Sequence, residues 1–235
     1  MTIPDELPTP AINTLLLVAI EDEAASLLPT KKPDPIWSYP PSPDANPMVA
    51  WRWPNLTIAI TGPGGPNHVA VCTALTAKAE REGEPYARLM NFGGVGAYEW
   101  SGLTLGDAVF IRESIQWNFF YPSRDWAWYT EPISDLEVPD SWTGRTCLSG
   151  SLFSTDRDRQ YPVFLTGDVE EYELYALSRV GQCLGIPVTS LKFVTNPVGP
   201  DGASVYLKEL EETREKATQI LRDFLAGTLH APWTY

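Results

Sequence analysis

An unbroken apolar run at residues 15–20 ends directly on three acidic residues, and it limits the possible folds more than any other feature. A run without alternating polar positions is typical of a strand that is covered on both faces. A second apolar run at residues 56–60 precedes a glycine-rich turn at 61–67 and an amphipathic pattern at 69–80, which predicts a strand, a loop and a helix. The pattern therefore indicates strands and helices in alternation around a buried sheet.

The same alternation continues toward the C-terminal region. Further strands are predicted at residues 88–92, 108–112, 146–153, 162–165 and 186–195. The first of these enters a second glycine-rich segment, 93–96, which we interpret as a loop. A helix is predicted at residues 169–184, with Gly185 as its C-terminal cap. The last helix carries one apolar stripe, formed by Tyr206, Leu210, Ala217, Leu221 and Phe224.

No internal repeat or change of composition divides the 235 residues, so we expect a single domain over residues 1–235. The expected fold class is α/β, a three-layer α/β/α sandwich around a central mixed, mostly parallel twisted sheet. Residues 1–12 are a proline-rich leader, and residues 29–54 and 116–145 are expected to be loop excursions, the first of them an extended loop with short edge strands. In such sheets, ligands bind beyond the carboxyl ends of the strands.

Charge and composition exclude several classes of partner. The formal net charge is −13 and no cluster of lysine or arginine is present, so no nucleic-acid partner is expected. The cysteines Cys72, Cys147 and Cys183 lie far apart and only His68 and His230 could join them, so no metal site is expected and the thiols are predicted to be small core side chains. The first apolar run is too short for a membrane span, which favours a soluble cytoplasmic protein without membrane contact.

Four predicted strand ends carry unusual chemistry and are expected to meet at one crevice. They are the acidic residues 21–23, the glycine-rich residues 62–65, the glycine-rich residues 93–96, and Thr195 with Asn196. A glycine-rich turn that enters a helix exposes backbone N–H groups, which can hold an anion, a hydroxyl group or a water. Tight turns alone would also explain these glycines.

A second acidic cluster lies in the predicted helix at residues 169–184. Glu170 and Glu171 are expected to be solvated and to interact with the helix dipole near its N-terminus. Glu173 falls on the inward side of the apolar stripe, where an unpaired carboxylate is unfavourable unless it meets a polar ligand. The pattern leaves open whether Glu173 is a buried functional group.

Taken together, the order and spacing of these segments resemble the purine nucleoside phosphorylase and nucleosidase superfamily, and most closely the methylthioadenosine/S-adenosylhomocysteine nucleosidases. The resemblance extends from residue 15 to about residue 224 and is carried by four segments: 17–23, 91–96 with 105–107, 149–153 and 168–196. It implies the phosphorylase/hydrolase-like fold and a purine nucleoside as the small-molecule partner. It also implies that no metal or organic cofactor is used, and that the protein is a homodimer or a larger homo-oligomer.

Carried over by position, the resemblance implies that Glu23 activates an attacking water and that Glu173 binds the ribose hydroxyls. Asn196 stands where the family has the acid that protonates N7 of a leaving adenine. Tyr172 would lie against the sugar, and Phe153 would stack on the base. The remaining residues predicted to bind substrate are Thr61, Gly62, Gly93 and Gly94. The implied reaction is hydrolysis of the N-glycosidic bond, in which a general base and stabilisation of the leaving base act together.

Several alternatives stay open. Asn196 cannot be a general acid, but its amide offers a donor and an acceptor, which suits a 6-oxopurine and resembles the futalosine hydrolases. A nucleoside phosphorylase is a further alternative, although no arginine lies beside the glycine-rich segments. A non-catalytic nucleoside-binding protein would also explain Asn196 and Tyr172. The aromatic residues 117–121 are predicted either to line a 5′-substituent pocket at a subunit contact or only to pack the excursion.

Overall fold

The computed structural model describes residues 6–39, 48–117, 131–151, 154, 162–199 and 202–230, apart from the side chains of Ala203 and Leu207. The strands are β1 (Thr14–Val18), β2 (Trp37–Tyr39), β3 (Met48–Trp53), β4 (Leu56–Ile60), β5 (Arg88–Ala97), β6 (Ala108–Gln116), β7 (Arg145–Ser149), β8 (Val169–Glu171) and β9 (Val188–Pro197). The helices are α1 (Glu21–Ala24), α2 (Gly65–Arg81), α3 (Leu174–Leu184) and α4 (Gly202–Ala226), with the short 3-10 helices η1 (Glu99–Ser101) and η4 (Pro162–Thr166). The α/β fold class is confirmed.

The strands of the described residues pair into one mixed sheet in the order β2-β3-β4-β1-β5-β8-β7-β6-β9. Because β5 also pairs with β9, the strands β5, β8, β7, β6 and β9 form a closed ring. The pairs β1–β4, β1–β5, β5–β9, β6–β7 and β7–β8 are parallel. The pairs β2–β3, β3–β4, β5–β8 and β6–β9 are antiparallel. The mixed sheet is confirmed, since five of these pairs are parallel and four are antiparallel, and a mostly parallel sheet stays a prediction.

The parallel strands β1, β4 and β5 are in register at one edge of the sheet, and this places the segments of the predicted site near one another. Val18 at the end of β1 pairs with Ile60 at the end of β4 and with Phe92 of β5. The segments that follow β1 and β4 therefore begin at the same edge as the second half of β5. On the other side of β5, the parallel strand β9 brings Asn196 beside Gly96.

The glycine-rich segment at residues 93–96 is part of a strand, so its prediction as a loop was wrong. β5 continues through it, and the glycines provide space rather than a turn. A Cβ on Gly93 would lie 3.1 Å from Oε2 of Glu23, and one on Gly94 would lie 2.9 Å from Cγ2 of Thr195. The first contact would be tight and the second closer than real Cβ atoms come, so the absence of side chains lets residues of α1 and β9 lie against the backbone of β5.

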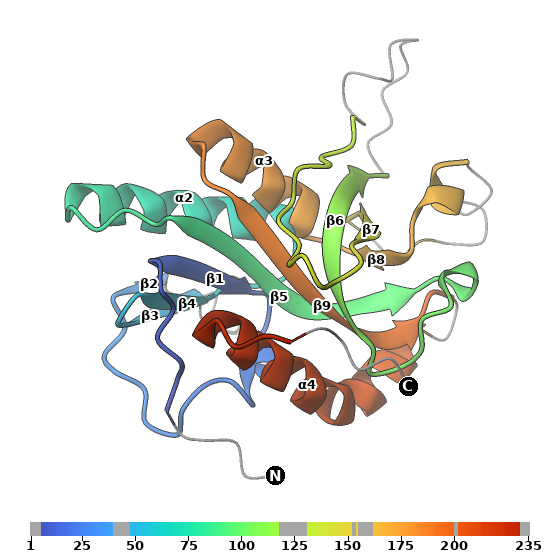
Figure 1. Ribbon diagram of the computed structural model, residues 1–235, viewed down its shortest axis with the longest axis horizontal. Coiled ribbons are helices and arrows are strands. Elements are labelled where there is room, and N and C mark those ends of the chain that lie inside the picture. Colours follow the sequence, from blue (N-terminus) through green and yellow to red (C-terminus); the bar gives the residue numbers. More distant parts are fainter. Residues whose placement is uncertain are drawn as a thin grey trace.

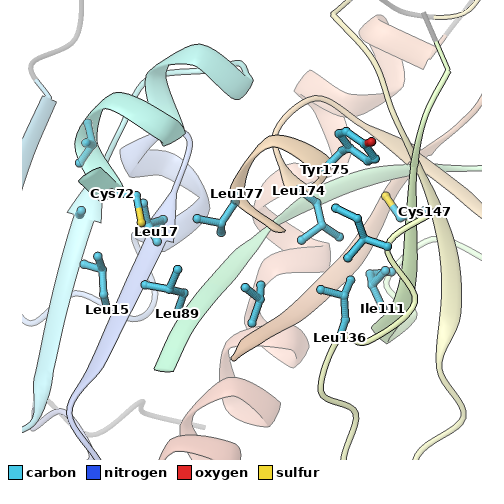
Figure 2. Close-up of a cluster of buried hydrophobic side chains, with 14 of the residues drawn as sticks. Leu15, Leu17, Cys72, Leu89, Ile111, Leu136, Cys147, Leu174, Tyr175 and Leu177 are labelled. Carbon is cyan, nitrogen blue, oxygen red and sulfur yellow. The ribbon is translucent and has the colours of Figure 1, made fainter. Parts of the chain in front are cut away.

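The continuous apolar run of β1 is explained by burial on both faces of the sheet. Figure 1 shows α2 and α3 on one side of the sheet and α4 on the other. Leu15 and Leu17 lie in the cluster shown in Figure 2, together with Cys72 of α2. Leu16 points to the opposite face, where it belongs to the cluster that contains Leu221 of α4. The predicted α/β/α layering stays our interpretation of this arrangement.

Two other sequence predictions concern helices. The apolar stripe of α4 is confirmed, because its residues pack in the second cluster: Tyr206, Leu210, Ala217, Leu221 and Phe224. The strand predicted at residues 162–165 is wrong, because this segment forms η4. Its apolar side chains contribute to a small third cluster, in which Phe164 packs against Trp117 with ring centroids 5.0 Å apart.

The helix predicted at residues 169–184 begins too early. Val169–Glu171 is the strand β8, which pairs with β5 and β7, and α3 starts only at Leu174. Glu170 and Glu171 are therefore not solvated residues of a first helical turn; both are buried. Gly185 ends α3 in the left-handed conformation, as predicted.

The first excursion contains the predicted edge strands, since β2 lies at the end of the sheet and β3 next to it. Residues 1–5 of the leader, 40–47 of the first excursion and 118–130 of the second lie outside the described residues. Cys72 and Cys147 are buried as predicted, whereas Cys183 is exposed because it lies away from the buried stripe of α3. Within the described ranges, no helix is long and apolar enough to cross a membrane.

Candidate active site

A cavity of about 350 Å³ lies where the ends of β1 and β9 and the glycine segment of β5 meet. Its walls include five of the residues predicted from the sequence: Glu23, Gly94, Tyr172, Glu173 and Asn196. Four glutamates lie in its wall, and among the described residues no lysine, arginine or histidine does. The cavity is thus an acidic pocket at the place where sheets of this kind bind small molecules.

Glu23 lies in the short helix α1 and is fixed through one of its two carboxylate oxygens. Its Oε1 accepts a hydrogen bond from the backbone N–H of Gly94 at 2.8 Å and lies 3.5 Å from the hydroxyl of Tyr206. Its Oε2 is buried and has no hydrogen-bond partner among the described residues. Burial raises the pKa of this carboxyl group above 4.5. An oriented, desolvated carboxylate with one free oxygen is suited to accept a proton from a bound molecule.

Glu173 approaches the cavity from the residue before α3. Its Oε1 accepts a hydrogen bond from the backbone N–H of Gly64 at 2.7 Å. Gly64 has φ +96°, a conformation that glycine adopts without strain, so the turn after β4 is shaped to donate to this carboxylate. Burial and the nearby carboxylate of Glu171 raise the pKa of Glu173 to about 8.

Glu171 also borders the cavity, but its hydrogen bonds are directed into the protein. It accepts hydrogen bonds from the backbone N–H groups of Glu173 at 2.8 Å and Leu174 at 2.9 Å, and from the hydroxyl of Ser149. The ammonium group of Lys192 lies 3.2 Å away, and both side chains are buried. The Lys192 ammonium and the hydrogen bonds lower the pKa of Glu171, against the effect of burial. This carboxylate joins β8, β9 and the N-terminus of α3.

Asn196 lines the cavity with an amide that is held from both sides. Its Oδ1 accepts a hydrogen bond from the hydroxyl of Thr195 at 2.9 Å, and its Nδ2 donates to the carbonyl of Pro197 at 3.0 Å. An amide group offers two hydrogens and two acceptor positions, so the bonds to described residues leave one donor and one acceptor of Asn196 for a ligand.

No family model and no curated protein matches this sequence. Solved structures match over nearly their whole length. The 5′-methylthioadenosine nucleosidase of Arabidopsis thaliana has a TM-score of 0.72 at 16% identity and covers 94% of this chain and 97% of that chain. The MTA/SAH nucleosidase of Colwellia psychrerythraea in complex with adenine has a TM-score of 0.71 at 16% identity, covering 96% of this chain and 100% of that chain. The chain has the nucleosidase fold.

Futalosine hydrolase of Helicobacter pylori has the same fold, with a TM-score of 0.69 at 14% identity over 92% of this chain and 98% of that chain. These proteins belong to the purine nucleoside phosphorylase/nucleosidase superfamily, so the resemblance found in the sequence is confirmed at the level of the fold. At 14–16% identity the similarity shows the fold alone, and the chemistry depends on the residues of the pocket.

Three of the predicted substrate-binding residues lie behind the wall of the nucleosidase-fold pocket. Thr61 is buried and turned inward, where its hydroxyl lies 3.2 Å from the carbonyl of Val18 and 2.8 Å from Nδ1 of His68. Gly62 belongs to the same turn, but Pro63 and not Gly62 lines the cavity. Gly93 contacts Glu23 rather than the cavity. Phe153, predicted to stack on a base, lies outside the described residues.

Sequence reasoning missed four polar residues of the wall: Ser154, Glu170, Glu171 and Tyr206. Glu170 was assigned to a solvated helix start, and only recognition of β8 as a strand would have turned it inward. Tyr206 was counted as part of the packing stripe of α4. Its hydroxyl lies near Glu23, so the stripe also reaches the pocket. Trp117 packs against Phe164 in the third cluster and does not line the cavity.

Gly93→Ala is expected to destabilise the fold by about 1–3 kcal/mol, because the new methyl group would press on the carboxylate of Glu23. The displaced carboxylate should also lower any activity that depends on Glu23 by about tenfold or more. Urea unfolding measures the first effect. The matched control is the same substitution in a Glu23→Ala background, where the destabilisation should disappear. An equal loss in both backgrounds would contradict the contact.

Proposed function

We propose that the protein is a purine nucleosidase that hydrolyses the N-glycosidic bond with water as the acceptor. The observation that carries the proposal is the buried Oε2 of Glu23 in the pocket wall, which has no hydrogen-bond partner in the described part of the chain. A second carboxylate, Glu173, lies in the same wall and is held by Gly64. The nucleosidase fold of the chain supports the same activity.

In the proposed reaction, Oε2 of Glu23 takes a proton from a bound water while the water oxygen forms a bond to C1′ of the sugar. The bond between C1′ and the base nitrogen breaks, and its electron pair leaves with the base. Glu173 accepts hydrogen bonds from the ribose hydroxyls, and in its ionised form its charge stabilises the cationic character that develops on the sugar. The raised pKa of Glu23 makes it a stronger base than an exposed glutamate. The amide of Asn196 stabilises the leaving base by hydrogen bonding, and the proton released by water finally reaches the base.

Water is favoured over phosphate because the charge of the pocket is unfavourable for an anion. Glu23, Glu170, Glu171 and Glu173 all border the cavity, and none of the described wall residues is cationic. A phosphate would have to enter beside these carboxylates without a compensating arginine or lysine in the wall. Lys192 is buried behind the wall and already pairs with Glu171.

Two alternatives rest on specific features. Asn196 in place of a general acid favours a 6-oxopurine nucleosidase like futalosine hydrolase, whose fold the chain shares. The same asparagine, together with Tyr172, would fit a non-catalytic nucleoside-binding protein.

The single domain over residues 1–235 and the assembly into a homo-oligomer both stay predictions.

The test is product analysis by chromatography with mass detection on the purified protein. The panel contains methylthioadenosine, S-adenosylhomocysteine, adenosine, inosine, guanosine and futalosine, each with and without phosphate. We expect release of free base and free sugar at the same rate in both conditions. Strict dependence on phosphate with a sugar 1-phosphate product would establish a phosphorylase instead. Binding of a nucleoside without any release of base would favour the non-catalytic alternative.

A further inference from the structure

Glu170 is the one glutamate of the pocket wall that neither the proposed reaction nor the joining of β8 to α3 uses. It belongs to β8 and pairs directly with Gly96 of β5. On the other side of the same glycine, Asn196 of β9 also pairs with Gly96. Directly paired residues of neighbouring strands point to the same face of a sheet. Glu170 and Asn196 therefore flank one position that has no side chain, and all three residues line the cavity.

The bare position of Gly96 is built into the pocket. A Cβ at this position would lie 3.0 Å from Nδ2 of Asn196 and 3.0 Å from Cγ2 of Val198. Both neighbours would have to move to admit even a methyl group. No side chain therefore stands between Glu170 and Asn196 at this position, so a planar ring can approach both side chains.

The carboxylate of Glu170 is held in place by two donors. Its Oε1 accepts a hydrogen bond from the backbone N–H of Ser154 at 2.8 Å, and its Oε2 accepts one from the hydroxyl of Tyr98 at 2.6 Å. Tyr98 is itself buried and stacks on Trp100 with ring centroids 4.7 Å apart. Each carboxylate oxygen has a second acceptor position, so the fixed group can still accept a hydrogen bond from a ligand.

These contacts give this part of the wall a defined polarity. The backbone N–H of Ser154 would be a donor, but Glu170 uses it. What Glu170 offers to the cavity is an acceptor, and Asn196 adds one donor and one acceptor beside it. A ligand edge that carries an N–H donor next to a carbonyl acceptor matches this set. An edge with a bare nitrogen acceptor would place its lone pair against a carboxylate.

Resting on the proposed function, we propose that Glu170, with Asn196 across Gly96, reads the base and selects a 6-oxopurine over adenine. A 6-oxopurine carries N1–H beside its C6 carbonyl, whereas adenine carries a bare N1 beside an amino group. Glu170 accepts the N1–H, and the free amide hydrogen of Asn196 is available to a carbonyl or ring nitrogen acceptor of the base. An adenine bound in the same orientation would place its bare N1 against this fixed acceptor, which is unfavourable.

The proposal is tested first by calorimetric binding of the free bases hypoxanthine and adenine to the full chain. We expect hypoxanthine to bind at least tenfold more tightly than adenine. Glu170→Gln, which replaces one carboxylate oxygen with an NH₂ donor, should lower this ratio by tenfold or more. Tyr98→Phe removes the hydroxyl that orients Glu170 and should lower the ratio to a smaller extent. Glu99→Gln is the control, because this exposed carboxylate follows Tyr98 in the sequence and lies outside the pocket wall.

Equal or tighter binding of adenine, no detectable binding of either base, or an unchanged ratio in a folded Glu170→Gln variant would overturn the proposal. Turnover of inosine and adenosine then separates it from the proposed function. Cleavage of both nucleosides without bias would keep the nucleosidase and reject the role of Glu170. A binding preference that depends on Glu170, without cleavage of any nucleoside, would keep that role and reject the nucleosidase.

Discussion

Glu23→Gln is expected to lower the turnover of the best nucleoside substrate by a factor of about 100–10,000, the usual contribution of a positioned general base. Glutamine keeps the size of the side chain and an oxygen that can accept the hydrogen bond from the N–H of Gly94. It cannot take a proton from water. Binding of the nucleoside should therefore change little while kcat falls. Steady-state kinetics combined with calorimetric binding to the variant measures both quantities.

The matched control for this variant is Asp22→Asn. Asp22 precedes Glu23 in α1, and its side chain is exposed and lies outside the pocket wall. We expect turnover within about twofold of the unmodified protein, since a surface substitution of this kind changes little. If Glu23→Gln kept full turnover, the water-activating role of Glu23 would be ruled out, and Glu173 would be the next candidate for the base.

Glu173→Gln is expected to lower kcat/KM by about 100–1,000-fold and, at the same time, to stabilise the fold at neutral and alkaline pH. The activity falls because the neutral amide no longer stabilises positive charge on the sugar. The stability rises because burial and Glu171 raise the pKa of Glu173 from 4.5 to about 8, so the ionised carboxylate is unfavourable in the folded state. Glutamine avoids this charge and can still accept from the N–H of Gly64.

The direction of the pH dependence follows from the raised pKa. Below the unfolded value of 4.5, Glu173 is protonated in both states, and the variant should be as stable as the unmodified protein. As the pH rises from 4.5 to about 8, the unfolded state loses its proton first, so the unmodified protein loses stability relative to the variant. We expect the difference to reach about 1–3 kcal/mol in urea unfolding at alkaline pH. A difference that is constant over this range would show that Glu173 does not titrate in this way.

The parts of the fold that could be predicted were those in which hydrophobic pattern and burial coincide. The apolar runs that became β1 and β4 are covered by helices or strands on all sides, so their sequences contain no competing signal. The stripe of α4 was equally clear because one helix face meets the core. The predicted Glu23, Glu173 and Asn196 reached one cavity because Glu23 follows β1, Glu173 follows β8 and Asn196 lies near the end of β9, and the topology brings these strand ends together.

The parts that could not be predicted are those where a residue is used against its usual preference. Gly93, Gly94 and Gly96 favour a turn by local rules, yet they lie in β5 because side chains from other elements need that space. Glu170 and Glu171 disfavour a buried strand, and they are tolerated in β8 because donors distant in the sequence satisfy both carboxylates. Partners such as Tyr98 and Lys192 leave no local signal beside β8, so a single sequence does not reveal them.

The closed ring of β5, β8, β7, β6 and β9 has a consequence for how the protein reaches its functional state. The pocket takes residues from α1 near the start of the chain and from β9 and α4 near its end. During synthesis, the ring cannot close until β9 has been made. Until then, β5 and β6 lack their pairing with β9, and part of their apolar surface stays uncovered. The acidic pocket is thus one of the last features that the chain can assemble, and contacts over such long sequence separations slow folding. The pocket can therefore form only after the ring has closed.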